Sequence, residues 1–375
     1  MRASPYVLML RCHFSLWLLA IFLSAGIPAA AQLSSPVPDP LARIREAAKS
    51  NVEACSATGE TLCEQVAPKI IANAQGDSPL AKNLRSVREE LSGVAGSTAA
   101  ARAVAWGLAA FQDAGVEAHV EKFATPDGNL TEQQNVVADI RGREKPEEWV
   151  LVGAPLDTFA NGPGISDYNC DAAMLIEAAR DISRTAIHPR RSLRFVLFAD
   201  SDQSMPGSWA YAGSHRMELD HASAAIIFRT GCSRMTGFSL NGRHDIENGL
   251  REAMKPVASM GADHFDFVAW LRTDNFDFLV EGLPTLTAKE VSAKYTFDTL
   301  PAGISSDKID LADLKYNTAI VAVTAFGVAE RATPIGPRQS RAQIASLLKS
   351  SGLEREMKTA GLWPLWQSGQ RGRLP

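Results

Sequence analysis

Near the middle of the chain, two aspartates follow an apolar segment. Residues Trp149–Gly153 have the composition of a buried central strand, and Asp157 and Asp167 lie in the Gly- and Pro-rich loop after it. A helical pattern, Ala172–Ile182, comes next. Open α/β sheets present functional residues in this way, in loops at the carboxyl ends of their strands. Carboxylates in such a loop are able to hold a hard metal cation.

A second acidic segment follows another predicted strand. Leu193–Ala199 is apolar, and Asp200, Ser201 and Asp202 come directly after it. Asp167 and Asp202, with backbone carbonyls, would suit a single hard cation such as Ca²⁺, and this is one interpretation. Ser201 has the chemistry of a nucleophile, but no G-x-S-x-G elbow surrounds it. The chain also contains no H-E-x-x-H zinc motif.

The elements that would position these residues alternate along the chain. Strand patterns are found at Val116–Phe123, Asn135–Ile140, Trp149–Gly153, Leu193–Ala199, Ala224–Arg229 and Pro284–Thr287. Helical patterns are found at Ser78–Leu91, Thr98–Ala114, Ala172–Arg184, Gly207–His215, Asp245–Val257, Leu311–Ala329 and Gln339–Lys358. This alternation favours an α/β fold, which we expect to be a three-layer sandwich with a mixed, mostly parallel central sheet flanked by helices.

The first residues have the features of a targeting segment. Arg2 and Arg11 supply positive charge, Phe14–Leu23 is an apolar stretch too short to span a bilayer, and Ala29–Ala31 fits an A-x-A cleavage site. We expect cleavage near Ala31 and an exported protein, periplasmic or secreted, with an uncleaved N-terminal anchor as the alternative. No later segment is long and apolar enough to cross a membrane.

The net charge limits the classes of partner that are expected, and the cysteines bear on the redox state of the compartment. The net charge is −4 and no run of Lys or Arg stands out, so nucleic acid is not an expected partner. In an oxidising compartment, Cys55 and Cys63 are candidates for a disulfide, because a short loop between helical segments can close them. A disulfide between Cys170 and Cys232 stays an open possibility.

Several separated segments, in the right order, resemble one known family. They are AWGLAAFQDAGVEAHVEKF at 105–123, NVVADIRG at 135–142, RRSLRFVLFADSDQSMPGS at 190–208, DNFDFLVEGLPTL at 274–286 and SSDKIDLADL at 305–314. The resemblance covers roughly residues 78–329, and it is to the co-catalytic zinc aminopeptidases and carboxypeptidases of peptidase clan MH, family 28. It implies a zinc-peptidase-like fold. The expected organisation is a signal peptide at 1–31, a leader and helical extension at 32–77, the family domain at 78–330 and a helical tail at 331–375.

The resemblance also implies a particular chemistry. In the family, two zinc ions bind a bridging water and lower its pKa. The metal ligands are a His, a bridging Asp, the second Glu of a pair, another Asp and a final His. The first Glu of the pair is the general base. Such a site needs several anionic or imidazole ligands at once.

Three of the five ligand positions have changed to residues that do not suit zinc. Pro155 stands in place of the first His, Arg229 in place of the second Asp, and Asn275 in place of the final His. The bridging aspartate, Asp167, is retained, and so is Asp157, which in the family orients the first His. The histidines of the mature chain lie outside the ligand positions and are expected at the surface or at helix ends: His119, His188, His215, His221, His244 and His264.

The Glu pair has changed as well. Ser201 occupies the position of the general base and cannot take a proton from water near neutral pH, while Asp202 is a shorter carboxylate in place of the second Glu. A register shift of one or two residues would bring Asp200 to the position of the base instead. Arg229 is expected to form salt bridges with Asp167 and Asp202 in a site without zinc.

These differences predict a function. We expect an exported, non-catalytic pseudopeptidase that binds a peptide or a protein and needs no cofactor. The alternatives are an active metallo-exopeptidase with atypical ligands, a single cation held by Asp167 and Asp202, and a scaffolding protein whose cleft is closed. The oligomeric state stays open.

Overall fold

The computed structural model describes residues 65–91, 97–124, 132–156, 167–199, 205–290 and 309–374. For residues 87–91, 97–99, 132 and 167–169 it describes the path of the backbone alone. The predicted signal peptide, the leader and the Cys55–Cys63 disulfide lie outside these residues. No helix in the described ranges is long and apolar enough to cross a membrane.

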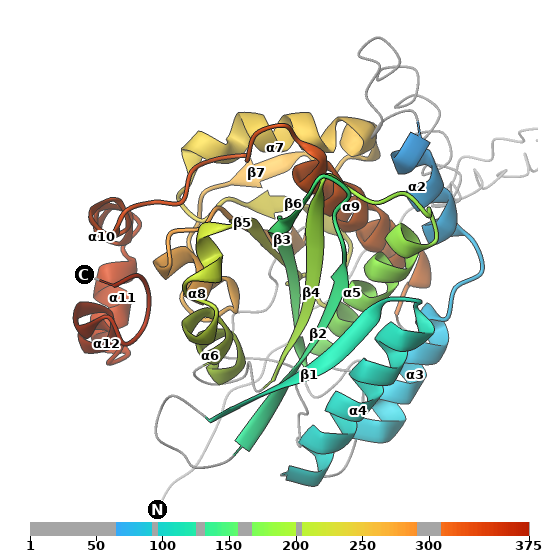
Figure 1. Ribbon diagram of the computed structural model, residues 1–375, viewed down its shortest axis with the longest axis horizontal. Helices are drawn as coiled ribbons and strands as arrows, with labels where there is room; N and C mark the ends of the chain where they lie inside the picture. Colours follow the sequence, from blue (N-terminus) through green and yellow to red (C-terminus); the bar gives the residue numbers. More distant parts are fainter. Residues whose placement is uncertain are drawn as a thin grey trace, which may run out of the picture. The chain divides into compact units, whose positions relative to one another are not determined.

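The described strands form one sheet in the order β1-β2-β4-β3-β5-β8-β6-β7 (Figure 1). Neighbours β4, β3, β5 and β8 are parallel, as are β6 and β7, whereas β1/β2, β2/β4 and β6/β8 are antiparallel. The sheet is therefore mixed and mostly parallel, as predicted. The strands are β1 (Glu117–Ala124), β2 (Glu132–Ile140), β3 (Lys145–Leu156), β4 (Arg191–Ala199), β5 (Ala222–Ile227), β6 (Met235–Ser239), β7 (His264–Asp266) and β8 (Thr285–Glu290).

Helices cover both faces of the sheet and confirm the three-layer arrangement. One face packs against α4 (Ser97–Asp113), α5 (Asp167–Ser183) and α9 (Leu311–Glu330). Beside these helices lie α3 (Leu80–Leu91), next to α4 and α5, α2 (Ala67–Gln75), next to α5 and α9, and α7 (Glu247–Met254), next to α9. The other face packs against α6 (Pro206–Ser214), the short 3₁₀ turn η2 (Glu218–Asp220) and α8 (Asn275–Val280). Strand β3 explains the division, because its side chains alternate between the faces. Val150 and Val152 join the first core, and Trp149 and Leu151 join the second.

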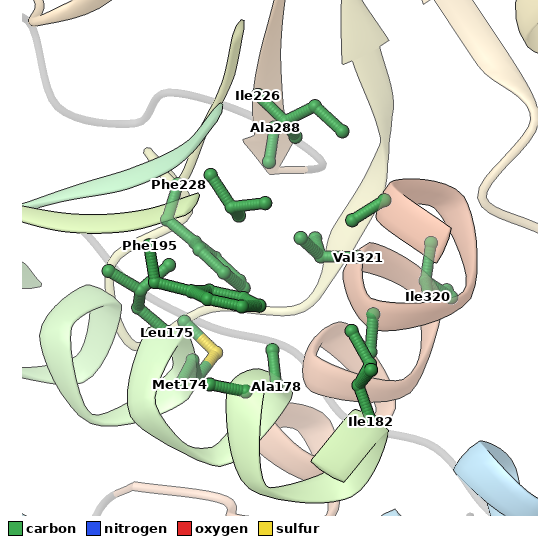
Figure 2. Packing of buried hydrophobic residues seen from close by; sticks show 14 of the residues in the cluster. Met174, Leu175, Ala178, Ile182, Phe195, Ile226, Phe228, Ala288, Ile320 and Val321 are labelled. Carbon is green, nitrogen blue, oxygen red and sulfur yellow. The ribbon is translucent and has the colours of Figure 1, made fainter. Parts of the chain in front are cut away.

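The main core lies between the sheet and the pair α5 and α9. Figure 2 shows Phe195 and Phe228 from the sheet side packing toward Leu175 and Ala178 of α5, with Val321 of α9 closing the cluster. Helix α9 is largely apolar and has no polar face, and every residue from Tyr316 to Ala329 is buried. This central helix holds the sheet and the neighbouring helices in fixed positions.

The C-terminal region differs from the sequence-based expectation. The predicted single helix Gln339–Lys358 is two helices, α10 (Arg341–Ser350) and α11 (Leu353–Thr359), followed by α12 (Trp363–Ser368). Gly352 has a φ of 85°, a left-handed conformation that glycine adopts readily, and it separates α10 from α11. Strands β6 and β7 have no counterpart in the prediction, and α7 is flanked by 3₁₀ turns, η3 (His244–Ile246) and η4 (Lys255–Met260).

Candidate functional site

Two of the positions that the resemblance assigns to metal ligands, Pro155 and Arg229, lie at one edge of the sheet. Strands β3 and β4 run parallel with Leu156 opposite Ala199, and β3 pairs with β5 with Gly153 opposite Ile227. The segments that follow these three strands therefore leave the sheet at the same edge, which we call the carboxyl edge. Pro155 lies at this edge, and Arg229 follows β5 there.

Several candidate residues lie at or beyond the limits of the described structure. Asp157, Ser201 and Asp202 lie outside the described residues, although the strands that precede them end at the carboxyl edge. Asp167 is the first residue of α5, and the path of its backbone is described without its side chain. The predicted salt bridges of Arg229 with Asp167 and Asp202 therefore stay a prediction.

Pro155 is buried near the end of β3, where it offers a ring and no side-chain donor. The carbonyl of Gly153 points toward β5 and accepts a hydrogen bond from the Phe228 amide at 2.9 Å. Pro155, two residues later, faces the same side, where the pairing with β5 has already ended. The missing amide therefore costs no hydrogen bond in the sheet, and proline is tolerated inside a central strand.

The side chain of Asn275 forms hydrogen bonds within the core of the protein. It begins α8 and is fully buried, its Nδ2 donates to Asn241 Oδ1 at 3.0 Å, and its Oδ1 accepts from the Thr273 hydroxyl. Asn241 in turn donates to Thr287 Oγ1 at 3.1 Å. Both ends of the Asn275 amide are therefore occupied by core partners, and neither is directed to a metal at the carboxyl edge.

The loop after β5 is fixed against the first turn of α5. A disulfide joins Cys170 of α5 to Cys232 of the loop, with their Cα atoms 5.2 Å apart, and this resolves the pairing left open by the sequence. Asp171 Oδ1 accepts from the amides of Thr230 at 3.2 Å and Gly231 at 3.0 Å, and from the Thr230 hydroxyl at 3.4 Å. The half-buried Arg229 is thus carried on a loop with two separate attachments to α5.

Asn317 of α9 secures the other end of the same loop. Its Oδ1 accepts from the Met235 amide at 2.8 Å, and its Nδ2 donates to the Ser233 carbonyl at 2.8 Å. Sequence reasoning did not single out Asp171 or Asn317. Asp171 directly follows a cysteine near the start of a helix, and this position could have indicated a contact with a neighbouring loop. Asn317 lies within an apolar helical pattern, and nothing in that pattern indicates a contact of its side chain.

A different group of polar residues lies at the opposite edge of the sheet. A cavity of about 750 Å³ opens there, lined among others by Trp149, Asp139, Arg194 and Glu218. The Arg194 guanidinium lies 5.1 Å from the centre of the Trp149 ring and donates to Asp139 at 2.9 Å. Because Trp149 stands near the start of the parallel part of β3, this cavity is remote from the carboxyl edge and from the family's ligand positions.

Among the histidines, His215 has the most extensive contacts. It follows α6, its Nε2 lies 2.9 Å from Glu121 Oε2, and its Nδ1 lies 3.2 Å from Glu218 Oε1. Burial acts to lower the pKa of His215, but the hydrogen bonds and charges of Glu121 and Glu218 outweigh it and raise the pKa. Likewise burial would raise the pKa of Glu121, yet the nearby His215 lowers it. This network ties β1 to the end of α6.

At two of the ligand positions that the resemblance assigns, the described structure offers no group to zinc. Pro155 has no ligand atom, and the amide of Asn275 is engaged by Asn241 and Thr273. Over the ranges that the structure describes, no three or more His, Cys, Asp or Glu side chains converge so as to hold a metal ion. The side chains of Asp167 and Asp202 lie outside those ranges, so the single-cation hypothesis stays a prediction.

Comparison with known proteins places the chain in a family. The model of peptidase family M28 matches residues 135–324, just over half of the 375-residue chain. The chain belongs to this family, which confirms the resemblance seen in the sequence.

Individual relatives agree with this assignment. Carboxypeptidase Q of Pongo abelii is 25% identical over 207 residues, which cover 53% of this chain and 42% of that protein. The chain thus matches less than half the length of this curated relative. A solved structure of a peptidase M28 precursor from Shewanella amazonensis SB2B has a TM-score of 0.65 at 16% identity, covering 78% of this chain and all of that one. BSAP, a zinc aminopeptidase from Bacillus subtilis, has a TM-score of 0.56 at 11% identity, covering 70% and 97%. Both structures share the fold.

Proposed function

We propose that this M28 family member is an exported pseudopeptidase, which keeps the peptidase fold but binds a peptide or protein without hydrolysing it. The observation that carries the proposal is the buried amide pair of Asn275 and Asn241. At the position where the family has its final histidine ligand, this chain has a residue whose side chain is part of the core.

The other changed positions support the same conclusion. Zinc is held by thiolate, imidazole or carboxylate groups, and Pro155 provides none of them. Arg229 replaces an anionic ligand with a fixed positive charge, which repels a metal dication rather than attracting it. Ser201 replaces the carboxylate that acts as the general base. These three positions therefore supply neither a zinc ligand nor a carboxylate base.

The attachments of the loop after β5 support a binding role. The Cys170–Cys232 disulfide, Asp171 and Asn317 fix this loop although its ligand residue has become Arg229. A rigid edge without catalytic groups is suited to holding a partner, because little order has to be gained on binding. Export is supported by the pattern of the first residues and by a disulfide, since disulfides persist in oxidising compartments.

The proposal is tested by incubating the purified protein with peptides that have free ends, in the presence of added zinc and then of a chelator. We expect the peptides to be recovered intact under both conditions. Release of amino acids that stops with the chelator and is lost in Asp167→Asn would instead establish an active exopeptidase with atypical ligands. The Asp167→Asn control separates such activity from that of a contaminating peptidase.

A further inference from the structure

Helix α5 carries two acidic side chains in the interior of the protein. Glu177 and Asp181 are one helical turn apart, and neither is exposed to solvent. Ser78 approaches Glu177, but within the described part of the chain none of the four carboxyl oxygens has a hydrogen bond of standard geometry. Buried carboxyl groups usually have such partners, so this pair calls for an explanation.

Three positive side chains face the pair, but their hydrogen bonds go to backbone carbonyls. Arg180 lies 3.5 Å from Glu177 and donates to the Asp113 carbonyl at 2.8 Å. Lys315 of α9 donates to the Gly76 carbonyl at 2.7 Å, and Arg184 donates to the Asp77 carbonyl at 3.4 Å. The carboxyl groups are therefore only partly neutralised. A metal ion does not suit this place, because three positive charges already surround it.

Helix α2 covers the pair. It packs against both α5 and α9, and its Ile70, Ile71 and Ala74 are buried in the main core. Asn73 of α2 donates to the backbone carbonyl of Asp181 at 2.9 Å. The Gly76 and Asp77 carbonyls that bind Lys315 and Arg184 belong to the turn directly after α2. Water can thus reach the pair if α2 and this turn move away.

The protonation of the pair is linked to the docking of α2. Burial raises the pKa of Asp181 from 3.8 to about 8, and the neighbouring Glu177 charge adds to the effect. Burial also raises the pKa of Glu177. With α2 docked, the buried pair binds protons that it would release if α2 moved away and water reached it. The docked state therefore loses stability as the pH rises from the ordinary carboxyl range to about 8.

We propose that Glu177 and Asp181 form a pH-operated latch beneath α2: with the pair protonated, α2 is docked, and ionisation of the pair at alkaline pH releases α2 and the turn that follows it. The latch is independent of the proposed function, since the two residues lie ten and fourteen positions beyond Asp167, away from the carboxyl edge.

The test is amide hydrogen exchange at pH 6 and pH 9, with each rate divided by that of an unstructured peptide at the same pH. We expect the protection of residues 70–74 in α2 to fall by at least about tenfold between these pH values, since a shift of one pKa unit is a factor of ten in an equilibrium. Helix α11, which packs in a separate cluster, is the internal reference and keeps its protection.

Two near-isosteric variants complete the test, Asp181→Asn and Glu177→Gln, each of which removes one ionisation. Asp181→Asn removes the group with the pKa of about 8, so the protection of α2 should lose most of its pH dependence, whereas Glu177→Gln should remove a smaller part of it. The proposal is overturned if α2 protection in the unmodified protein does not change with pH, if α11 loses protection in parallel, or if the fall persists in both variants.

Discussion

At the scale of single residues, the contact of His215 with Glu121 depends on the protonation of both groups. The raised pKa of His215 gives a stabilisation that is complete below the ordinary value of 6.5 and is lost as the pH rises through the raised value. The lowered pKa of Glu121 gives a stabilisation that is present above 4.5 and is lost as the pH falls through the lowered value. The network is therefore strongest between these two ordinary values.

We predict that His215→Gln lowers the melting temperature most between pH 4.5 and pH 6.5, with a smaller difference at pH 8. The measurement is thermal unfolding across this pH range. His221→Gln is a matched control, because His221 is exposed, follows η2 and makes no ion pair with the residues that the structure describes. A difference that is equal at all pH values would contradict the charged contact.

Asn275 is the residue whose role differs most from that expected at its position in the family. Replacing it with Ala leaves the Oδ1 of Asn241 and the hydroxyl of Thr273 without their partner. We predict a loss of about 1–3 kcal/mol of unfolding free energy for each buried group left unpaired. Denaturant unfolding measures this loss, and Asn248→Ala, at an exposed position of α7, should change the stability by less than about 0.5 kcal/mol. Equal, small effects would show that the amide pair is not formed.

At the scale of elements, α8 is held by the end of the chain. The Arg371 guanidinium makes two hydrogen bonds with Asp277, at 2.7 and 3.0 Å, and Ser208 of α6 donates to the same carboxyl group at 2.8 Å. Burial acts to raise the pKa of Asp277 despite the charge of Arg371. The C-terminal residues therefore belong to the packed structure around the helix that begins at Asn275.

We predict that Arg371→Ala costs about 3–5 kcal/mol of stability, because it leaves Asp277 buried without its charged partner. The double variant Arg371→Ala with Asp277→Asn should recover part of this loss. Arg251→Ala, which breaks an exposed pair with Glu247 on α7, is the control and should cost at most about 1 kcal/mol. If Arg371→Ala lowered the unfolding free energy as little as the control does, the buried ion pair of Arg371 with Asp277 would be contradicted.

The Cys170–Cys232 disulfide also connects two elements, α5 and the loop after β5. It closes a segment between two residues separated by 62 positions, and its removal takes away one of the attachments of the loop that carries Arg229. We predict that replacing Cys170 and Cys232 with Ala lowers the unfolding free energy by about 2–5 kcal/mol, as for native disulfides in small exported domains. The check is denaturant unfolding with and without a reductant. The variant should be insensitive to the reductant, and an unmodified protein that is equally insensitive would show that the disulfide is absent.

At the scale of the whole molecule, the sheet and its main helices were predictable because their signals are local. The apolar runs of β3, β4 and β5 and the largely apolar α9 can be recognised from their own residues, without reference to other segments. Strands β6 and β7 are too short for such a pattern. The helical periodicity of the C-terminal region continues across Gly352, so the break depended on a single backbone conformation.

The candidate site was predictable in part for the same reason. The loss of ligand groups at Pro155 and Asn275 is visible in the residue types alone. The partner of Asn275, however, is Asn241, which lies 34 residues earlier and has no pattern that marks it. The Cys170–Cys232 pairing and the contact of Asp171 with Thr230 depend on how α5 and the loop after β5 meet in space. Such contacts follow from the assembled fold.

We propose that the M28 fold of this chain forms no zinc site, and the metal content of the purified protein tests this directly. The purified protein is saturated with zinc, freed of loosely bound metal by gel filtration, and analysed for metal and protein content. We predict far less than one zinc ion per chain, because Pro155 has no ligand atom and the Asn275 amide is bound within the core. A retained content near one or two zinc ions per chain would contradict it.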